Sequence, residues 1–184
     1  MMKNLIKFFM LVAATSILFS GCLTVEKKEY TFEFTGENSG ILTIRYINIL
    51  SIMDDGMDVS ESDFDELLTT YLYGSSIEEE YQMAYVVSKR LYEQDAMLCA
   101  EVVIEFPDLA AAKLHQFSKD SYYMYALCQC LNSESYVSSN GSFGSTEVPV
   151  VIWPAGSQKL ELVTSVTEPD ETTISLLPYY QAWE

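Results

Sequence analysis

Few side chains in this sequence have the types and the spacing that catalysis needs. His115 is the single histidine among 184 residues, and it lies far along the chain from Ser142 and Ser145. The run 140–144 lacks the first glycine of the G-x-S-x-G nucleophile elbow. A pair of Cys99 with His115 stays open as an alternative, although buried structural cysteines are far more common. The sequence therefore predicts no catalytic site and no enzyme.

Three cysteines beyond residue 22 could bind a metal or form a disulfide: Cys99, Cys128 and Cys130. Cys128-x-Cys130 has no second pair of cysteines or histidines that would complete a structural zinc site. On a strand these two cysteines share one face about 6.5–7 Å apart, which discourages a disulfide between them. We therefore expect either burial of all three or a disulfide from Cys99 to Cys128 or Cys130.

An acidic loop, Asp54-Asp55-Gly56-Met57-Asp58, precedes the first predicted helix. Its carboxylates invite a calcium site, but their spacing does not match the EF-hand pattern. Asp54, Asp55 and Asp58 are therefore weak calcium candidates. A solvated loop at a helix N-terminus is the favoured interpretation, and no metal or cofactor is expected.

The first 22 residues have the pattern of an export signal. Lys3 and Lys7 precede an apolar run over 8–19, which is too short to cross about 30 Å of hydrocarbon as a helix but fits the apolar region of a signal peptide. The run ends in Phe19-Ser20-Gly21-Cys22. This ending resembles the lipobox of bacterial lipoproteins.

The resemblance implies that residues 1–21 are removed and that Cys22 receives a diacylglyceryl thioether. Two or three acyl chains hold a protein stably on a membrane, whereas one chain binds only marginally. Leu23 rather than aspartate follows the cysteine, which in the sorting rule of Gram-negative lipoproteins favours the outer membrane. The expected location is thus the bacterial cell envelope, with the membrane as a partner through Cys22. The resemblance covers the first 22 residues alone, and residues 23–184 show no motif of a particular family.

Acidic side chains dominate the rest of the chain. Residues 22–184 hold eight basic and 27 acidic residues, a formal charge of about −19. Such a surface repels nucleic-acid phosphates, so no nucleic-acid partner is expected. It also repels anionic lipid headgroups, so we expect the domain to stand away from the membrane. Residues 22–28 are predicted to be the lipidated cysteine with a short tether, and residues 29–184 a single acidic domain.

Alternating apolar and polar residues predict several strands. Residues 29–35 and 41–50 have the pattern of a hairpin. Residues 122–131 are apolar on both faces, which is typical of a central strand covered on both sides. Two further strands are expected at residues 148–153 and 159–167, and the apolar tail 174–180 is expected to pack on the domain.

A second hairpin is predicted at residues 84–92 and 97–106. Joining the two strands through Glu93–Ala96 places Leu91 opposite Leu98 and makes one face nearly all apolar. A shift by one residue would mix the two faces, so the pattern supports this register.

Helical spacing is clearest between Ser60 and Gly74. Apolar residues from Phe64 to Leu72 fall at i, i+3, i+4, i+7 and i+8, which predicts one amphipathic helix. Gly74 is expected to end this helix. Shorter helices are predicted from Ser76 and over 108–117. Together these elements predict an α+β fold, an antiparallel sheet of about six or seven strands with two or three helices packed on one face.

These patterns favour a non-enzymatic, lipid-anchored envelope protein that presents its domain to an envelope protein partner or a ligand, or supports envelope assembly. The first alternative is an extracytoplasmic carrier of a hydrophobic ligand, which should have a roomy apolar cavity under the helix. The second is a hydrolase that uses carboxylates, such as a glycosidase, which should place two of them about 5–10 Å apart in a cleft.

Overall fold

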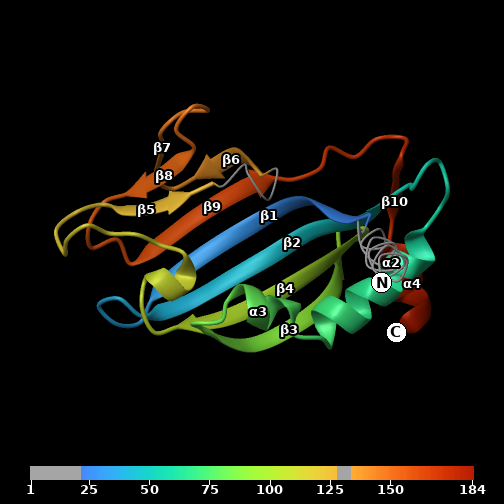
Figure 1. The fold of residues 1–184 in the computed structure, drawn as a ribbon, viewed down its shortest axis with the longest axis horizontal. Helices are drawn as coiled ribbons and strands as arrows, with labels where there is room; N and C mark the ends of the chain where they lie inside the picture. Colours follow the sequence, from blue (N-terminus) through green and yellow to red (C-terminus); the bar gives the residue numbers. More distant parts are fainter. Residues whose placement is uncertain (1–21, 128–133) are drawn as a thin grey trace, which may run out of the picture.

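The computed structural model describes residues 22–127 and 134–184 (Figure 1). Ten strands and five helical segments follow one another along this part of the chain. The strands are β1 (Leu23–Phe34), β2 (Gly40–Ile52), β3 (Tyr85–Gln94), β4 (Met97–Phe106), β5 (Tyr123–Ala126), β6 (Ser135–Ser139), β7 (Ser142–Phe143), β8 (Val150–Trp153), β9 (Lys159–Ser165) and β10 (Thr173–Ser175). The helical segments are α2 (Ser60–Glu66), η1 (Leu67–Leu72), α3 (Ser76–Glu80), η2 (Ala110–Ala112) and α4 (Leu177–Trp183).

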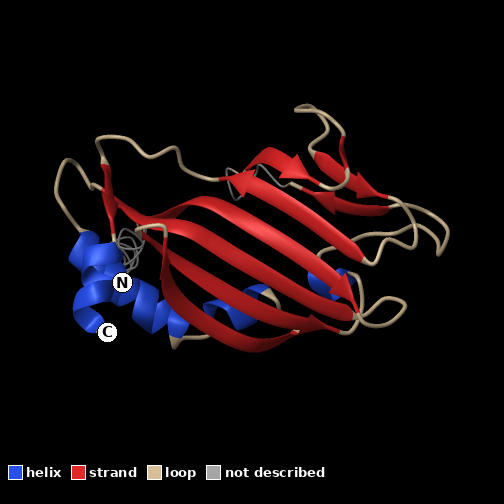
Figure 2. Ribbon diagram, turned by 180° about the vertical axis from the view of Figure 1, so that it is seen from behind, coloured by secondary structure: helices blue, strands red, loops and turns tan. Residues whose placement is uncertain are grey.

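A seven-stranded antiparallel sheet forms the centre of the molecule. Its order is β3-β4-β2-β1-β9-β6, and β10 pairs with the end of β2. A smaller sheet has the order β5-β8-β7. Helices lie against one face of the large sheet, and its other face is open in the rear view (Figure 2). This arrangement confirms the predicted α+β fold.

The hairpin of β1 and β2 is confirmed, but it begins earlier than expected. β1 starts at Leu23, so no tether separates the domain from Cys22. Packing and a backbone hydrogen bond hold this end in the sheet. Val25 is buried, and the backbone N–H of Ile52 donates to the Cys22 carbonyl at 2.8 Å. Residues predicted as a tether are therefore part of a strand that pairs with both β2 and β9.

The pairing of β3 with β4 corrects the predicted register. Leu91 lies opposite Ala100 rather than Leu98. The connection is a turn of two residues, Asp95 and Ala96, which both have positive φ (53° and 58°), as type I′ hairpin turns require. Next to the turn this shift by two residues keeps the same side chains on the same face, which is why the sequence pattern could not reveal it. A bulge between Val86 and Ser88 then places Val86 opposite Ile104, so the predicted pairing is wrong by one residue there, and Tyr85 and Val87 are exposed.

The predicted amphipathic helix is present in two forms. α2 is α-helical, but η1 is a π-helix, in which the N–H of Tyr73 donates to the carbonyl of Leu68 at 2.9 Å. Gly74 ends it as predicted. A Cβ at Gly74 would lie 2.4 Å from the Thr70 carbonyl oxygen, so this close approach requires glycine.

Two predictions between residues 108 and 131 are wrong. The helix expected over 108–117 is only the 3₁₀ turn η2, because Lys113 adopts a left-handed conformation with φ 58° and stops it. Of the central strand expected over 122–131, residues 123–126 form β5, which stands at an edge of the small sheet; residues 128–131 lie outside the described part of the chain. β5 still packs inward, because the Tyr125 ring contacts that of Phe32.

The predicted packing of the C-terminal tail is confirmed. β10 pairs with β2, and α4 follows it. Leu176 and Tyr180 are buried with Val25 and Phe64 in a cluster at this end of the sheet. β1 therefore begins at the same end of the molecule as α2, α4 and the C-terminus (Figure 1).

Candidate functional site

A pocket of about 310 Å³ lies between the large sheet and the helical segments that cover it. Its size is at the lower end of the range for small-molecule sites, about 300–1,000 Å³. Aliphatic side chains form most of its wall. The sheet contributes Leu23, Val25, Ile49 and Leu91, and the helical side contributes Leu67, Leu72 and Ile77.

The π-helix η1 forms part of the roof of this pocket, through Leu67, Tyr71 and Leu72. π-helical turns are rare and often occur at functional sites. Lys89 fixes the end of the roof to the sheet, because its Nζ donates to the Gly74 carbonyl at 2.6 Å and to Glu78 at 3.0 Å. The roof is thus held in place by an ion pair as well as by packing.

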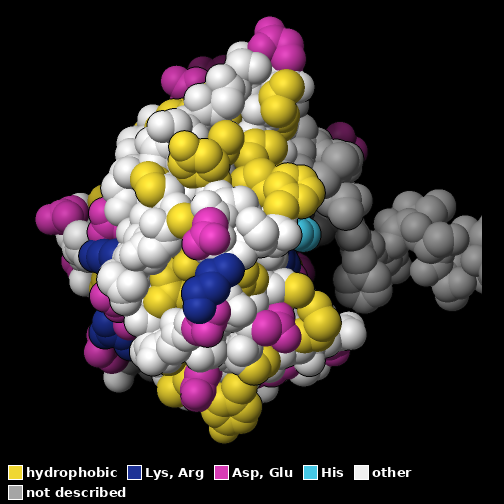
Figure 3. All heavy atoms as spheres, turned by 90° about the vertical axis from the view of Figure 1, so that its left-hand side faces the viewer, with side chains coloured by type: hydrophobic (Ala, Val, Ile, Leu, Met, Phe, Trp, Pro, Cys, Tyr) yellow, Lys and Arg dark blue, Asp and Glu magenta, His cyan; other side chains and the backbone are white. Residues whose placement is uncertain are grey.

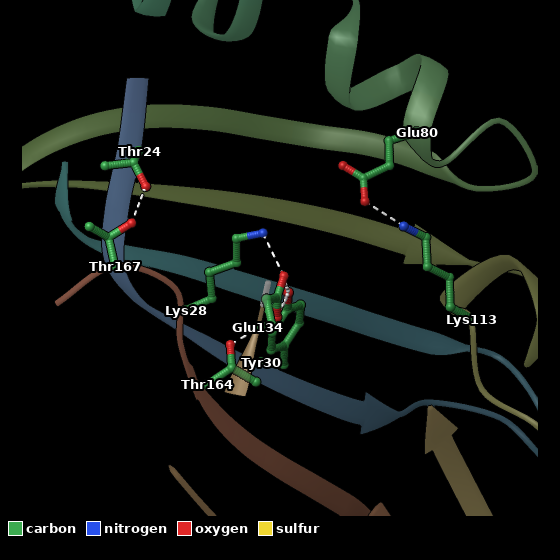
Figure 4. Close-up of polar contacts among 8 residues, drawn as sticks. All are labelled: Thr24, Lys28, Tyr30, Glu80, Lys113, Glu134, Thr164 and Thr167. Atoms are coloured by element: carbon green, nitrogen blue, oxygen red, sulfur yellow. Dashed lines mark hydrogen bonds and ion pairs between the residues drawn. The ribbon is translucent and has the colours of Figure 1, made fainter. Parts of the chain in front are cut away.

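A buried carboxylate, Glu134, organises the floor beside the pocket (Figure 4). Lys28, which lines the pocket, donates to its Oε1 at 2.7 Å. The Tyr30 hydroxyl contacts both of its oxygens at 3.1 and 3.0 Å, and the Thr164 hydroxyl donates to Oε2 at 2.9 Å. This network joins β1 and β9 to the residue that precedes β6, and it fixes the position of the Lys28 ammonium group.

Tyr46 offers a polar group toward the pocket. Its ring lies 5.6 Å from the Lys28 Nζ, and burial raises the pKa of its hydroxyl, so the group stays neutral. Within residues 22–127 and 134–184, this hydroxyl has no hydrogen-bond partner. The described residues hold no buried side-chain polar atom without a hydrogen-bond partner, so the hydroxyl of the half-buried Tyr46 is in contact with solvent and can pair with a ligand that replaces this water.

Every charged side chain that lines the pocket is paired within the protein. Lys28 pairs with Glu134 and Lys89 with Glu78. The other pairs are Glu80 with Lys113 and Arg90 with Glu101. The carboxylates of the pocket are thus held by cations, which does not resemble the free carboxylate pair that a hydrolase needs.

Cys22, the predicted lipidation site, is half-buried directly before β1. Burial raises the pKa of its thiol, and the carboxylates of Asp63, Asp54 and Glu66 raise it further. Acidic side chains therefore surround the residue that the lipobox resemblance marks for acylation.

The three calcium candidates are used in other ways. Asp54 and Met57 exchange backbone hydrogen bonds of 3.0 and 2.8 Å across a tight turn, in which Asp55 has a φ of 47°. The Asp58 carboxylate accepts from the backbone N–H of Ser60, the first residue of α2, at 2.9 Å. Across the described ranges, no group of three or more acidic, histidine or cysteine side chains could hold a metal ion.

The remaining candidates do not form a site. Cys99 is a buried, free thiol in β4, so it does not form the disulfide that was one of the two expectations for it. Its two candidate partners, Cys128 and Cys130, lie outside the described residues. His115 is exposed and pairs through its backbone with Met124. No hydrogen bond joins His115 to Cys99 in the part of the chain that the structure describes.

Sequence reasoning missed Lys28, Tyr46 and Glu134 as members of one site. Lys28 fell within the predicted tether, although it shares a strand face with Tyr30 and Phe32 by alternation. That alternation was the available signal for Lys28. Glu134 contacts Lys28 across 106 residues of sequence, and no local pattern reveals such a contact.

Comparisons with protein families, with curated proteins and with solved structures give no match for this chain. Among the residues that the structure describes, none of the helices is long and apolar enough to cross a membrane.

Proposed function

We propose that the protein is held at the bacterial cell envelope by lipid on Cys22 and binds a small, largely apolar molecule. The binding site is the pocket between η1 and the large sheet. The observation that carries this proposal is the aliphatic wall of a pocket of about 310 Å³. Such a wall with a few polar groups is typical of small-molecule sites.

The pocket opens to solvent and offers about 310 Å³ to a ligand. A mostly aliphatic wall gives water few hydrogen bonds, so an apolar ligand that displaces it gains free energy. A roomy apolar cavity under the helix is also what a carrier of hydrophobic ligands should have.

Binding can be tested with a neutral lipophilic dye, Nile red, whose fluorescence rises in apolar sites. Ala100 lines the pocket, so Ala100→Phe should fill it and lower dye affinity at least about tenfold. Ala126 is exposed on β5, so Ala126→Phe is the matched control and should bind as the wild type does. Equal affinity in both variants, with circular dichroism showing both folded, would refute a site in this pocket.

The anchor has its own test. Mass spectrometry of the N-terminal peptide of protein purified from membranes should show acylated Cys22, and Cys22→Ala should prevent both acylation and cleavage. A free thiol on Cys22, or cleavage elsewhere, would overturn the anchoring part of the proposal.

Presentation of a surface to a partner protein is the second candidate function. Seen from the end opposite to Cys22, hydrophobic side chains gather in several patches between acidic ones (Figure 3). The loops around the small sheet expose Phe117, which is 91% accessible, together with Tyr122 and Val148. Large exposed apolar groups of this kind favour contact with another protein. Chemical cross-linking in intact cells, compared between the wild type and Phe117→Ser, would test this candidate.

A further inference from the structure

We infer that the pocket takes up an uncharged lipid directly from the membrane that holds Cys22, through the wall formed by residues 23–25. The inference rests on the proposed function, since it requires both the anchor and the binding pocket. It adds the chemical class of the ligand, a neutral glycerolipid such as a diacylglycerol, and the route by which the ligand enters.

The predicted anchor, Cys22, directly precedes residues in the wall of the pocket. Leu23, Thr24 and Val25 all line the pocket, and they directly follow Cys22. A strand rises about 3.3 Å per residue, so the lipid on Cys22 begins within about 10 Å of the pocket wall. Leu23 is half-buried, like Val166 beside it in the same wall. The wall therefore reaches the molecular surface next to the anchor.

The end of β1 next to Cys22 is held in the fold. The Cys22 carbonyl accepts from the Ile52 N–H at 2.8 Å, and the hydroxyls of Thr24 and Thr167 are 2.6 Å apart (Figure 4). A flexible tether would let the domain drift away from the bilayer. Because β1 starts one residue after the anchor, the wall of the pocket stays at the membrane surface instead.

The charged groups that line the pocket favour an uncharged ligand. The lysines and carboxylates that line the pocket are paired with one another or with neighbours, so a charged headgroup would find no free counter-ion. Burying an unpaired ion costs several kcal/mol. The carboxylates of Asp54 and Glu66 near Cys22 also repel anionic lipids at the entrance.

The Tyr46 hydroxyl favours a ligand that carries a polar glycerol part. A neutral glycerolipid carries ester carbonyls and a free hydroxyl, and either can pair with this group. Its acyl chains match the aliphatic wall. The Lys28 Nζ lies 5.6 Å from the Tyr46 ring, and these polar groups of the wall orient such a ligand with its glycerol part toward them.

The test uses the full lipidated protein in phosphatidylcholine vesicles that contain pyrene-labelled diacylglycerol. Uptake by the pocket dilutes the probe and is followed as a loss of pyrene excimer emission. A flexible Gly-Ser spacer of about twelve residues, inserted between Cys22 and Leu23, has a root-mean-square length of about 20 Å. The matched control carries the same spacer between Glu37 and Asn38, in the β1–β2 loop.

We expect the spacer at Cys22 to slow uptake at least about fivefold, while the control spacer leaves the rate unchanged and Ala100→Phe abolishes uptake. Nile red affinity should be the same for both spacer variants, because the pocket itself is intact. Equal uptake rates for the two spacers would overturn direct entry. Uptake of pyrene-labelled phosphatidylglycerol in place of diacylglycerol would overturn the uncharged class. A protein that binds neither lipid nor Nile red would instead refute the proposed function.

Discussion

Replacing Glu134 by glutamine keeps the size of the side chain but removes the charge that Lys28 contacts at 2.7 Å. The side chains of Lys28 and Glu134 are only 18% and 8% exposed, so the ammonium group would stay largely buried without its counter-ion. Lys28→Met removes the cation instead, and the double variant removes both charges. Together with the wild type, these proteins form a double-mutant cycle that isolates the ion pair.

The loss of unfolding free energy in each variant follows from the burial of the ion pair and from the hydrogen bonds that remain. Removing one partner of a buried ion pair costs about 3–5 kcal/mol, and the partial exposure of Lys28 places Glu134→Gln near about 3 kcal/mol. In Lys28→Met the carboxylate still accepts from Tyr30 and Thr164, and hydrogen bonds to charged groups contribute about 1.5–3 kcal/mol each. We therefore expect a loss of about 2 kcal/mol there. The double variant should also lose about 2 kcal/mol. The coupling free energy between the two side chains is then about 3 kcal/mol, at the upper limit for neighbouring residues.

Urea unfolding, followed by the fluorescence of the buried Trp153, would measure these free energies. Glu161→Gln is the matched control, because Glu161 forms an exposed ion pair with Lys159. Such pairs contribute about 0–1 kcal/mol, so this variant should be close to the wild type. A Glu134→Gln variant as stable as Glu161→Gln, with no coupling to Lys28→Met, would refute the role given to this pair.

Three further predictions concern the pocket and its surroundings. Ala100→Leu should raise the free energy of unfolding by about 2 kcal/mol, because it buries three more carbon atoms, and a lower thermal midpoint would show that the space is already filled. Gly74→Ala should lose about 1–3 kcal/mol in chemical denaturation, since its Cβ would lie 2.4 Å from the Thr70 oxygen; unchanged stability would contradict that close approach. Burial raises the pKa of Tyr30 and Tyr125, so their neutral forms stabilise the fold below the unfolded pKa of about 10, and this stability is lost as the pH rises further. Tyrosinate absorbance should therefore show these groups ionising only with unfolding, and early ionisation of all 13 tyrosines would contradict this.

Much of the fold could be predicted from local patterns. Alternation located both long hairpins, because one face of each strand is buried against the core. The apolar stripe from Phe64 to Leu72 located the helical roof, but a stripe does not reveal the hydrogen-bond spacing that makes η1 a π-helix. The turn at Asp95 and Ala96 lacks the glycine that usually marks a two-residue hairpin turn, and the register was therefore placed two residues away.

The candidate site was much harder to predict. Its wall combines residues from β1, β2, β3, β4, η1 and α3, and each of them had an ordinary explanation as core or surface. Lys28 lies in the stretch predicted as a tether, and Glu134 lies near the start of a stretch rich in polar residues. A pocket between packed layers forms where side chains do not fill the space, and the periodicity of apolar residues in the sequence does not show where that happens.

The pairing of β1 with β9 also sets the order in which the protein can fold. β1 is a central strand, and one of its two neighbours is supplied by Lys159–Ser165, near the other end of the chain. A chain that emerges with its N-terminus first must therefore wait for residue 165 before the large sheet can close. Until then the apolar faces of β1 and β2 lack β9 and the tail that covers them, and such unfinished sheets tend to aggregate. Late closure of the sheet therefore leaves these apolar faces uncovered until nearly the whole chain has been made.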